Sequence, residues 1–214
     1  MPTVAREALL QRLAHVDLHY RCSKALLDDH PAVQQWWVLA IEQDSNIVDD
    51  AGNPVEREIA RISLVRESLW RASLWDELDE LEGDLETVAS AILNRKRGDL
   101  AEELLDRLEG AGSSVLILNS ATLAAEWRGH GVGRLLAGVA LLALSDGVSC
   151  FATYPAPLDG STGAERDRAI LELGQVWARL GFQPFRDGVW VLDPALVTLD
   201  NAVTALKSDL GVAG

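Results

Sequence analysis

The chain has 214 residues, of which 48% are apolar and 24% charged, and its net charge is −14. This length can bury a substantial core, but no apolar run reaches the roughly 18–20 residues that span a bilayer, and the N-terminus has no signal-peptide pattern. We therefore expect a cytoplasmic globular protein with no membrane partner. The acidic balance argues against nucleic acid, and it is compatible with a cationic substrate such as an amine or with plain solubility.

Two cysteines, Cys22 and Cys150, lie far apart in the sequence and show no metal-ligand spacing. Neither a disulfide framework nor a metal site is expected. Each cysteine is interpreted as a small buried apolar residue.

The first half of the chain predicts helices around a β-hairpin. Its elements, in chain order, are a helix over 6–15, strands over 16–22, 33–41 and 58–66, and helices over 73–92 and about 99–110. Apolar residues recurring every three or four positions indicate the helices, and β-rich or alternating runs indicate the strands. The strands over 33–41 and 58–66 are expected to pair antiparallel.

The second half alternates strands and helices. Its elements are a strand over 115–123, a helix over about 131–144, a strand over 148–154, a loop over 155–163, a helix over 164–180, strands over 182–185 and 189–192, and a short helix within 193–214. The helix over 131–144 is apolar nearly all round, which predicts a buried central helix. We find no repeat or linker, so we expect one domain.

The most informative stretch is the glycine-rich run Leu123–Leu136. It lies between the expected strand and the apolar helix, and it holds Gly129, Gly131 and Gly133. Glycines let a ligand approach the backbone closely, and the N–H groups that begin a helix carry the positive end of its dipole without internal partners. The run therefore predicts a phosphate-binding loop.

Three kinds of phosphate loop are alternatives here. A Walker A loop ends in Gly-Lys-Ser/Thr, but Gly133 is followed by Arg134 and Leu135. A dinucleotide loop needs Gly-x-Gly-x-x-Gly in a βαβ unit, and neither this spacing nor the mostly antiparallel strand pattern fits. Both kinds are excluded.

The third kind fits. The run Arg-Gly-His-Gly-Val-Gly over 128–133 resembles the Arg/Gln-x-x-Gly-x-Gly/Ala motif of the GNAT acetyltransferases. The run from Trp177 to Phe182 resembles the Tyr-x-x-x-Gly-Phe signature that closes a later helix in that family. The resemblance implies an α/β fold of the α+β type, with a mixed, mostly antiparallel sheet that is splayed between strands 4 and 5 and flanked by helices. It also implies acetyl-CoA as cosubstrate and no metal.

The resemblance further implies which residues hold coenzyme A. The backbone near Ala121 and Leu123 would pair with the pantetheine arm, and the loop amides would hold the pyrophosphate. The implied binding residues are Ala121, Leu123, Arg128, Gly129, His130, Gly131, Val132, Gly133 and Arg134. Two of these, Arg128 and Arg134, would offset the acidic background.

The chain departs from the family where the catalytic acid is often found. Many members have a tyrosine four residues before the glycine of Gly-Phe, but Trp177 stands here, and an indole N–H does not release its proton near neutral pH. Ile170 likewise replaces an expected asparagine. Tyr154, at the end of the fifth strand, is the candidate substitute acid, with an aromatic at the rim of the core as the alternative interpretation. His130 either contacts a phosphate or points outward, and Glu126 is expected at the surface.

We therefore predict a single GNAT-like acetyltransferase domain over 1–214, with the acetyl-CoA motif over about 115–145 and the closing segment over about 164–192. It would transfer an acetyl group to a small-molecule or peptide amine by direct attack. The alternative, motivated by Trp177, is an acyl-CoA-binding or regulatory module without transferase activity. Toxin-type members act on charged tRNA, which the charge of −14 argues against. The sequence leaves the acceptor and a homodimer open.

Overall fold

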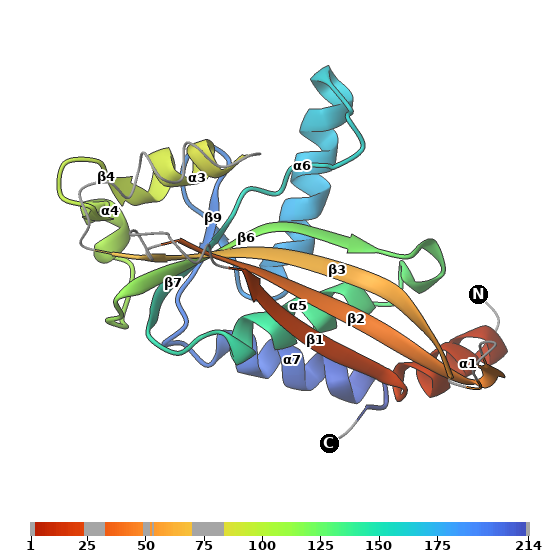
Figure 1. Ribbon diagram of the computed structural model, residues 1–214. Helices are drawn as coiled ribbons and strands as arrows, with labels where there is room; N and C mark the ends of the chain where they lie inside the picture. Colours follow the sequence, from red (N-terminus) through yellow and green to blue (C-terminus); the bar gives the residue numbers. More distant parts are fainter. Residues whose placement is uncertain (1–2, 24–32, 49–51, 53, 70–83, 213–214) are drawn as a thin grey trace.

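A computed structural model describes residues 3–23, 33–48, 52, 54–69 and 84–212. A seven-stranded sheet with strand order β1-β2-β3-β6-β7-β9-β8 forms its centre (Figure 1). The strands are β1 (Val16–Ser23), β2 (Val33–Val48), β3 (Pro54–Ser68), β4 (Leu93–Asn94), β5 (Asp99–Leu100), β6 (Ser114–Leu123), β7 (Val148–Thr153), β8 (Gln183–Pro184) and β9 (Trp190–Leu192). The helices are α1 (Thr3–Leu13), α3 (Leu85–Ile92), α4 (Glu102–Leu105), the 3-10 turn η1 (Ala125–Trp127), α5 (Val132–Ala143), α6 (Gly163–Ala178) and α7 (Thr198–Asp209).

Only one neighbouring pair in this sheet is parallel. β6 runs parallel to β7, and the other neighbours are antiparallel, including the predicted β2–β3 hairpin. The helix α5 connects the parallel pair, as such a crossover requires. The predicted fold class, an α+β arrangement with a mixed, mostly antiparallel sheet, is confirmed.

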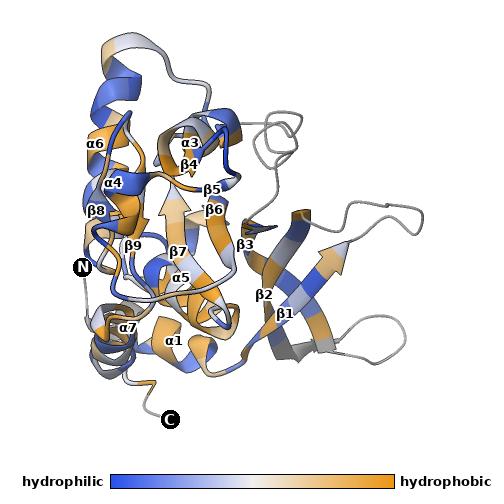
Figure 2. Ribbon diagram, turned by 90° about the vertical axis from the view of Figure 1, so that its left-hand side faces the viewer, coloured by the Kyte–Doolittle hydropathy of each residue, from blue (hydrophilic) through white to orange (hydrophobic). Residues whose placement is uncertain are grey.

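The central strands are buried on both faces, which explains their unbroken apolar sequence. One core packs the sheet against α1, α5 and α7, and a second core packs its other face against α3 and α4 (Figures 1 and 2). Consecutive residues of β6 alternate between the two, with Leu116 in the first core and Ile117 in the second. Within the described part of the chain, no helix is long and apolar enough to cross a membrane.

The helix α5 is the predicted buried central helix. A Cβ added to Gly138 would lie 2.6 Å from Cγ2 of Val203 on α7. Only glycine therefore allows the two helices to pack this closely. The tail of the chain, expected to hold a short helix, supplies α7 as a second layer over α5.

Two expectations from the sequence change, and a third can be followed only in part. The helix expected over 99–110 is reduced to α4, because a turn at Asn94–Gly98 closes the small β4–β5 ladder and draws Leu100 into a strand. The long helix expected over 73–92 is described only from Leu85 onward, as α3, and its first part lies outside the described residues. Cys22 was expected to be buried, but the edge strand β1 exposes it.

Candidate functional site

The site begins where β6 and β7 part. They pair from Ser114 with Val148 to Leu118 with Thr153, and β6 then continues alone along β3 to Leu123. The chain after Thr153 leaves the ladder because Pro155 lacks the N–H that pairing requires. The predicted splay between the fourth and fifth strands of the sheet is therefore present.

A β-bulge marks the same point on the other edge of β6. Ser63 of β3 is opposite Ser120, whereas the next residue, Leu64, is opposite Leu118. Asn119 is the extra residue, and such an insertion re-aims the backbone next to it. The bulge thus coincides with the start of the splay.

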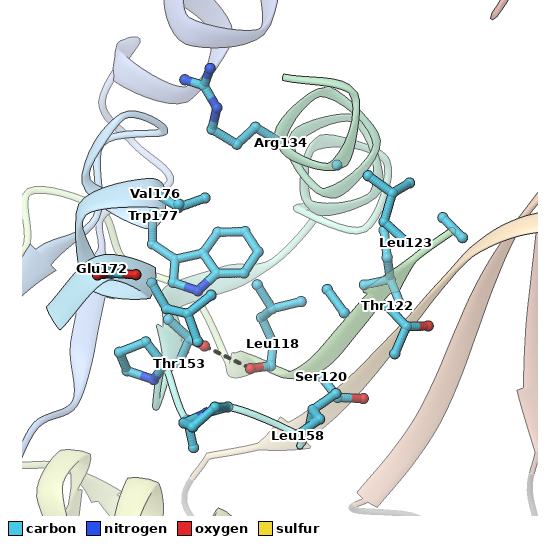
Figure 3. A pocket seen from close by; sticks show the side chains of 18 of the residues that line it. Leu118, Ser120, Thr122, Leu123, Arg134, Thr153, Leu158, Glu172, Val176 and Trp177 are labelled. Carbon is cyan, nitrogen blue, oxygen red and sulfur yellow. Dashed lines mark hydrogen bonds between the residues drawn. The ribbon is translucent and has the colours of Figure 1, made fainter. Parts of the chain in front are cut away.

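A buried hydrogen bond closes the last parallel pair. Oγ1 of Thr153 donates to the carbonyl oxygen of Leu118 at 2.9 Å (Figure 3). Since a buried carbonyl without a partner is costly, this bond stabilises the end of the ladder. It also fixes the position where the two strands separate.

Beyond that point, alternate amides of β6 face the gap. The N–H of Ala124 donates to the carbonyl of Ile59 on β3 at 2.8 Å. Amide directions alternate along an antiparallel strand, so Thr122 also faces β3, while Ala121 and Leu123 face away from it. The Leu123 carbonyl accepts a hydrogen bond from Nε of Arg128 at 2.8 Å. The groups that face the gap and could pair with a ligand are then the N–H of Leu123 and the N–H and carbonyl of Ala121.

The glycine loop meets this edge. Gly129 and Gly131 have φ of 79° and 84°, a left-handed conformation that favours glycine. Gly131 is the residue before α5, so the first amides of this helix point out of the loop. Gly133 lies in the first turn, where an added Cβ would be 3.3 Å from Cδ2 of Leu123. The helix therefore approaches the open half of β6 closely.

Three arginines surround this end of the site: Arg128 and Arg134 from the loop and α5, and Arg179 after α6. Among the described residues, no carboxylate lies within ion-pair distance of any of them. Burial and the nearby charge of Arg179 lower the pKa of Arg134, partly offset by Asp209. In a chain of charge −14, such a cluster makes this end of the cavity locally positive.

The loop is held from behind by Trp127, which is fully buried. The guanidinium of Arg12 on α1 lies 4.8 Å from its ring centroid, and Nε of Arg12 is 2.5 Å from Oε1 of Glu42 on β2. Two segments distant in the sequence, α1 and β2, thus help to position the residue before Arg128. The neighbouring Glu126 forms an ion pair with Arg57 and is half-exposed, as expected of a surface residue.

These features line one cavity of about 850 Å³. The cavity brings together most of the predicted site residues, namely Ala121, Leu123, Arg128, Gly129, Gly131, Gly133, Arg134 and Tyr154. Two others are elsewhere: His130 is not part of the lining, and Val132 is buried in the core beneath α5. Among the described residues, no cluster of histidine, cysteine and carboxylate side chains could hold a metal ion.

The wall opposite β6 comes from α6. Trp177 is 9% exposed, and its indole projects from α6 into the space toward β6 and α5 (Figure 3). The ring also meets Phe182 edge-to-face, with centroids 6.4 Å apart. Trp177 therefore forms a wall of the cavity. Ile170 does not line it, although its neighbour Ala169 does.

Tyr154, the residue just after β7, also lines the cavity, and its side chain packs against the second core. Its ring packs on the hairpin between β8 and β9, where a Cβ added to Gly188 would be 2.8 Å from Cε2. The loop that follows adds Leu158 and Asp159 to the lining, and hydrogen bonds from Ser161 lower the pKa of Asp159. That carboxylate therefore stabilises its own turn.

Sequence reasoning missed Arg179 and Thr153. Arg179 follows α6 two residues after Trp177, and its place beside the glycine loop depends on how α6 and α5 pack. Thr153 gave no signal, because a threonine at the end of an apolar strand is common. Only the pairing of the strands reveals its role.

A mostly antiparallel sheet whose one parallel pair opens beside a glycine loop is the arrangement that the resemblance to the GNAT acetyltransferases implies. The sequence matches no protein-family profile and no curated protein. Among solved structures, the chain is similar to a crystal structure of a mutant of KacT, a GNAT-family acetyltransferase toxin, with a TM-score of 0.39 and 12% identity over 87% of this chain and 81% of that one.

Proposed function

We propose that this chain is a GNAT-type N-acetyltransferase that transfers the acetyl group of acetyl-CoA to a small amine. The observation that carries the proposal is the continuity of one cavity from the arginine cluster, past the glycine loop, to the open edge of β6. A ligand with phosphates at one end, an extended arm and a reactive group at the other end would fit this cavity. Its phosphates would lie at the arginine cluster and the glycine loop, and its arm and reactive group would lie along the open edge of β6. The acidic remainder of the surface favours a cationic acceptor.

The residues present fit coenzyme A. The loop of Gly129 and Gly131, at the start of α5, offers backbone N–H groups and dipole to a pyrophosphate. Arg134 and Arg179 would contribute charge-assisted hydrogen bonds to its phosphates. The outward amide groups of Ala121 would pair with the pantetheine arm as an additional strand does.

The thioester of acetyl-CoA supplies an activated acyl carbon to the end of the cavity where the strands part. An amine nitrogen would form the new bond to that carbon as the carbon–sulfur bond breaks, without a covalent enzyme intermediate. The outward amides next to the Asn119 bulge are the donors suited to the developing oxyanion. The amine loses its proton to water or a base, and the leaving thiolate takes one from an acid.

Tyr154 is the residue we propose as that acid. It lines the same cavity and carries a phenolic O–H, whereas the indole of Trp177 cannot donate its proton near neutral pH. The second candidate function, an acyl-CoA-binding module without turnover, is favoured by Trp177 alone. Turnover with any amine separates the two.

The first test is calorimetry with acetyl-CoA. Gly131→Glu places a carboxylate at the loop and near Nη2 of Arg134, and we expect it to weaken binding at least about a hundredfold because it repels phosphate. Gly147→Glu is the matched control, since Gly147 also has positive φ and lies near Nη2 of an arginine, Arg66, after the opposite end of α5. Absence of heat with millimolar acetyl-CoA, or equal behaviour of the two variants, would contradict the proposal.

The second test is release of the coenzyme A thiol with a panel of amines. Tyr154→Phe should lower kcat about a hundredfold while the affinity for acetyl-CoA stays within about twofold, as expected for loss of a proton donor. If the parent protein binds acetyl-CoA but turns over no amine, the binding module replaces the enzyme. If Tyr154→Phe retains full kcat, another group supplies the proton.

A further inference from the structure

The two edges of the sheet differ in how they are protected against pairing with another chain. The β8 edge has two residues, one of them Pro184, which cannot donate to a ladder. The β1 edge has eight residues without proline or lysine, and its register with β2 is continuous, without a bulge. Among the described residues no strand pairs with its outer side, and β1 is the outermost strand in Figure 2. Within the part of the chain that the structure describes, the β1 edge is therefore open to strand addition.

The backbone restricts how a second strand can pair there. The first residue of β1, Val16, is opposite Glu42 of β2. One position further out, the N–H of Gln43 donates to the carbonyl of His15, so the backbone groups of His15 face β2. Because directions alternate, odd-numbered residues of β1 face β2 and even-numbered ones face outward. Two copies of β1 can then pair antiparallel only in registers in which one residue lies directly opposite its own copy in the partner. We name each register by that residue, at which the two-fold axis lies.

Charge selects one of these registers. With the axis at His19, Asp17 of each copy lies opposite Arg21 of the other, which forms two symmetric pairs of opposite charge. With the axis at Leu18, Asp17 meets His19, and with the axis at Tyr20, Arg21 meets His19, so both lose the pairs. Opposite charges across strands stabilise pairing, and like charges oppose it.

The other face of β1 agrees with this register. Leu18 and Tyr20 are partly buried against the first core. With the axis at His19, each Leu18 is opposite Tyr20 of the other copy, so the apolar face continues across the junction. Desolvation by burial already raises the pKa of Tyr20. In this one register, apolar residues therefore lie opposite apolar residues on one face of β1, and opposite charges face each other on the other face.

We propose that two copies of this chain form a homodimer through antiparallel pairing of their β1 strands about His19. The sheet of one protomer then continues into that of its partner. In the strand order, β2 and β3 separate β1 from β6, so the interface excludes the cavity. The dimer does not depend on the proposed acetyl transfer, and either can fail without the other.

The first experiment measures the mass of the whole chain over a dilution series by light scattering or sedimentation. We expect twice the chain mass of 23.2 kDa. Asp17→Arg and Arg21→Asp should each raise the dimer dissociation constant about tenfold, because each places like charges opposite one another twice. The double variant Asp17→Arg/Arg21→Asp should restore it. Within one protomer, Gln43 donates a hydrogen bond to Asp17, and Arg21 helps to lower the pKa of Glu58. Exchanging the two charges does not restore these contacts, so they do not explain such a rescue.

The second experiment tests the register by crosslinking. In a Cys22→Ser background, His19→Cys should form an intermolecular disulfide on mild oxidation, since residues at a non-hydrogen-bonded cross-strand position lie at disulfide distance. Asp17→Cys alone should not crosslink, but it should crosslink when mixed with Arg21→Cys. The remaining Cys150 is inert because full burial raises its thiol pKa to about 12. A monomer at every concentration, a double variant no tighter than the single ones, or crosslinking of Asp17→Cys with itself would overturn the proposal.

Discussion

The two halves of the strand β6 differ in how they are paired within the sheet. From Ser114 to Leu118 it is paired on both edges and buried, with Thr153 closing the end. From Asn119 to Leu123 it is paired only with β3, and its outer amides face a cavity. The first half thus contributes to stability, and the second is the half that the proposed ligand would contact. Changes in the two halves should therefore separate folding from binding.

The largest effect on folding is expected at Ile117, in the closed half. Its side chain is fully buried in the second core, so Ile117→Ala should lower the free energy of unfolding by about 2–5 kcal/mol. Thr122→Ala, on the exposed open half, should change it by less than about 0.5 kcal/mol. Denaturant titrations followed by circular dichroism measure both. Similar losses would show that the two halves do not differ as described.

The direction of the amides can be tested with proline. Thr122→Pro removes an N–H that faces β3 and should cost on the order of 2 kcal/mol of stability, whereas Ala121→Pro removes one that faces the gap and should cost less than about 1 kcal/mol. Acetyl-CoA affinity should reverse the order, with Ala121→Pro weakening it about tenfold. If Ala121→Pro is the more destabilising variant, the alternation along β6 is misassigned.

The boundary between the halves depends on the Thr153 hydroxyl. Thr153→Val keeps the shape and leaves the Leu118 carbonyl buried without its side-chain donor, so stability should fall by roughly 1–2 kcal/mol. Thr122→Val is the control, because that hydroxyl makes a 3.4 Å hydrogen bond on an exposed part of β6. Hydrogen exchange at the end of the β6–β7 ladder should accelerate only in Thr153→Val. No change there would mean that packing alone closes the ladder.

The sequence was sufficient for the parts of the site that local chemistry dictates. The glycines at 129 and 131, which have positive φ, predict the loop from local sequence alone. The splay between β6 and β7 was implied by the family resemblance, and Pro155, two residues after β7, is consistent with it. The strands around them were found because alternation and β-rich runs are local signals. Most of the predicted site residues accordingly line one cavity.

What escaped prediction depends on packing. Val132 lies in the motif but faces the core, because side chains of a helix alternate between faces within a few residues. Arg179 reaches the cavity only through the placement of α6. The segment after Gly98 has leucines at helical spacing, yet the first of them, Leu100, lies in the strand β5 and pairs with β4. Periodicity predicts which residues are buried better than which element buries them.

The contact of Arg12 with Trp127 and Glu42 has a consequence for how the molecule opens. It couples the N-terminal helix and the second strand to the turn that precedes the glycine loop, across more than half of the sequence. Segments joined in this way unfold as one cooperative unit rather than fraying separately. The loop therefore shares the local stability of α1, and the order of the glycine loop in the middle of the chain depends in part on Arg12, close to its start.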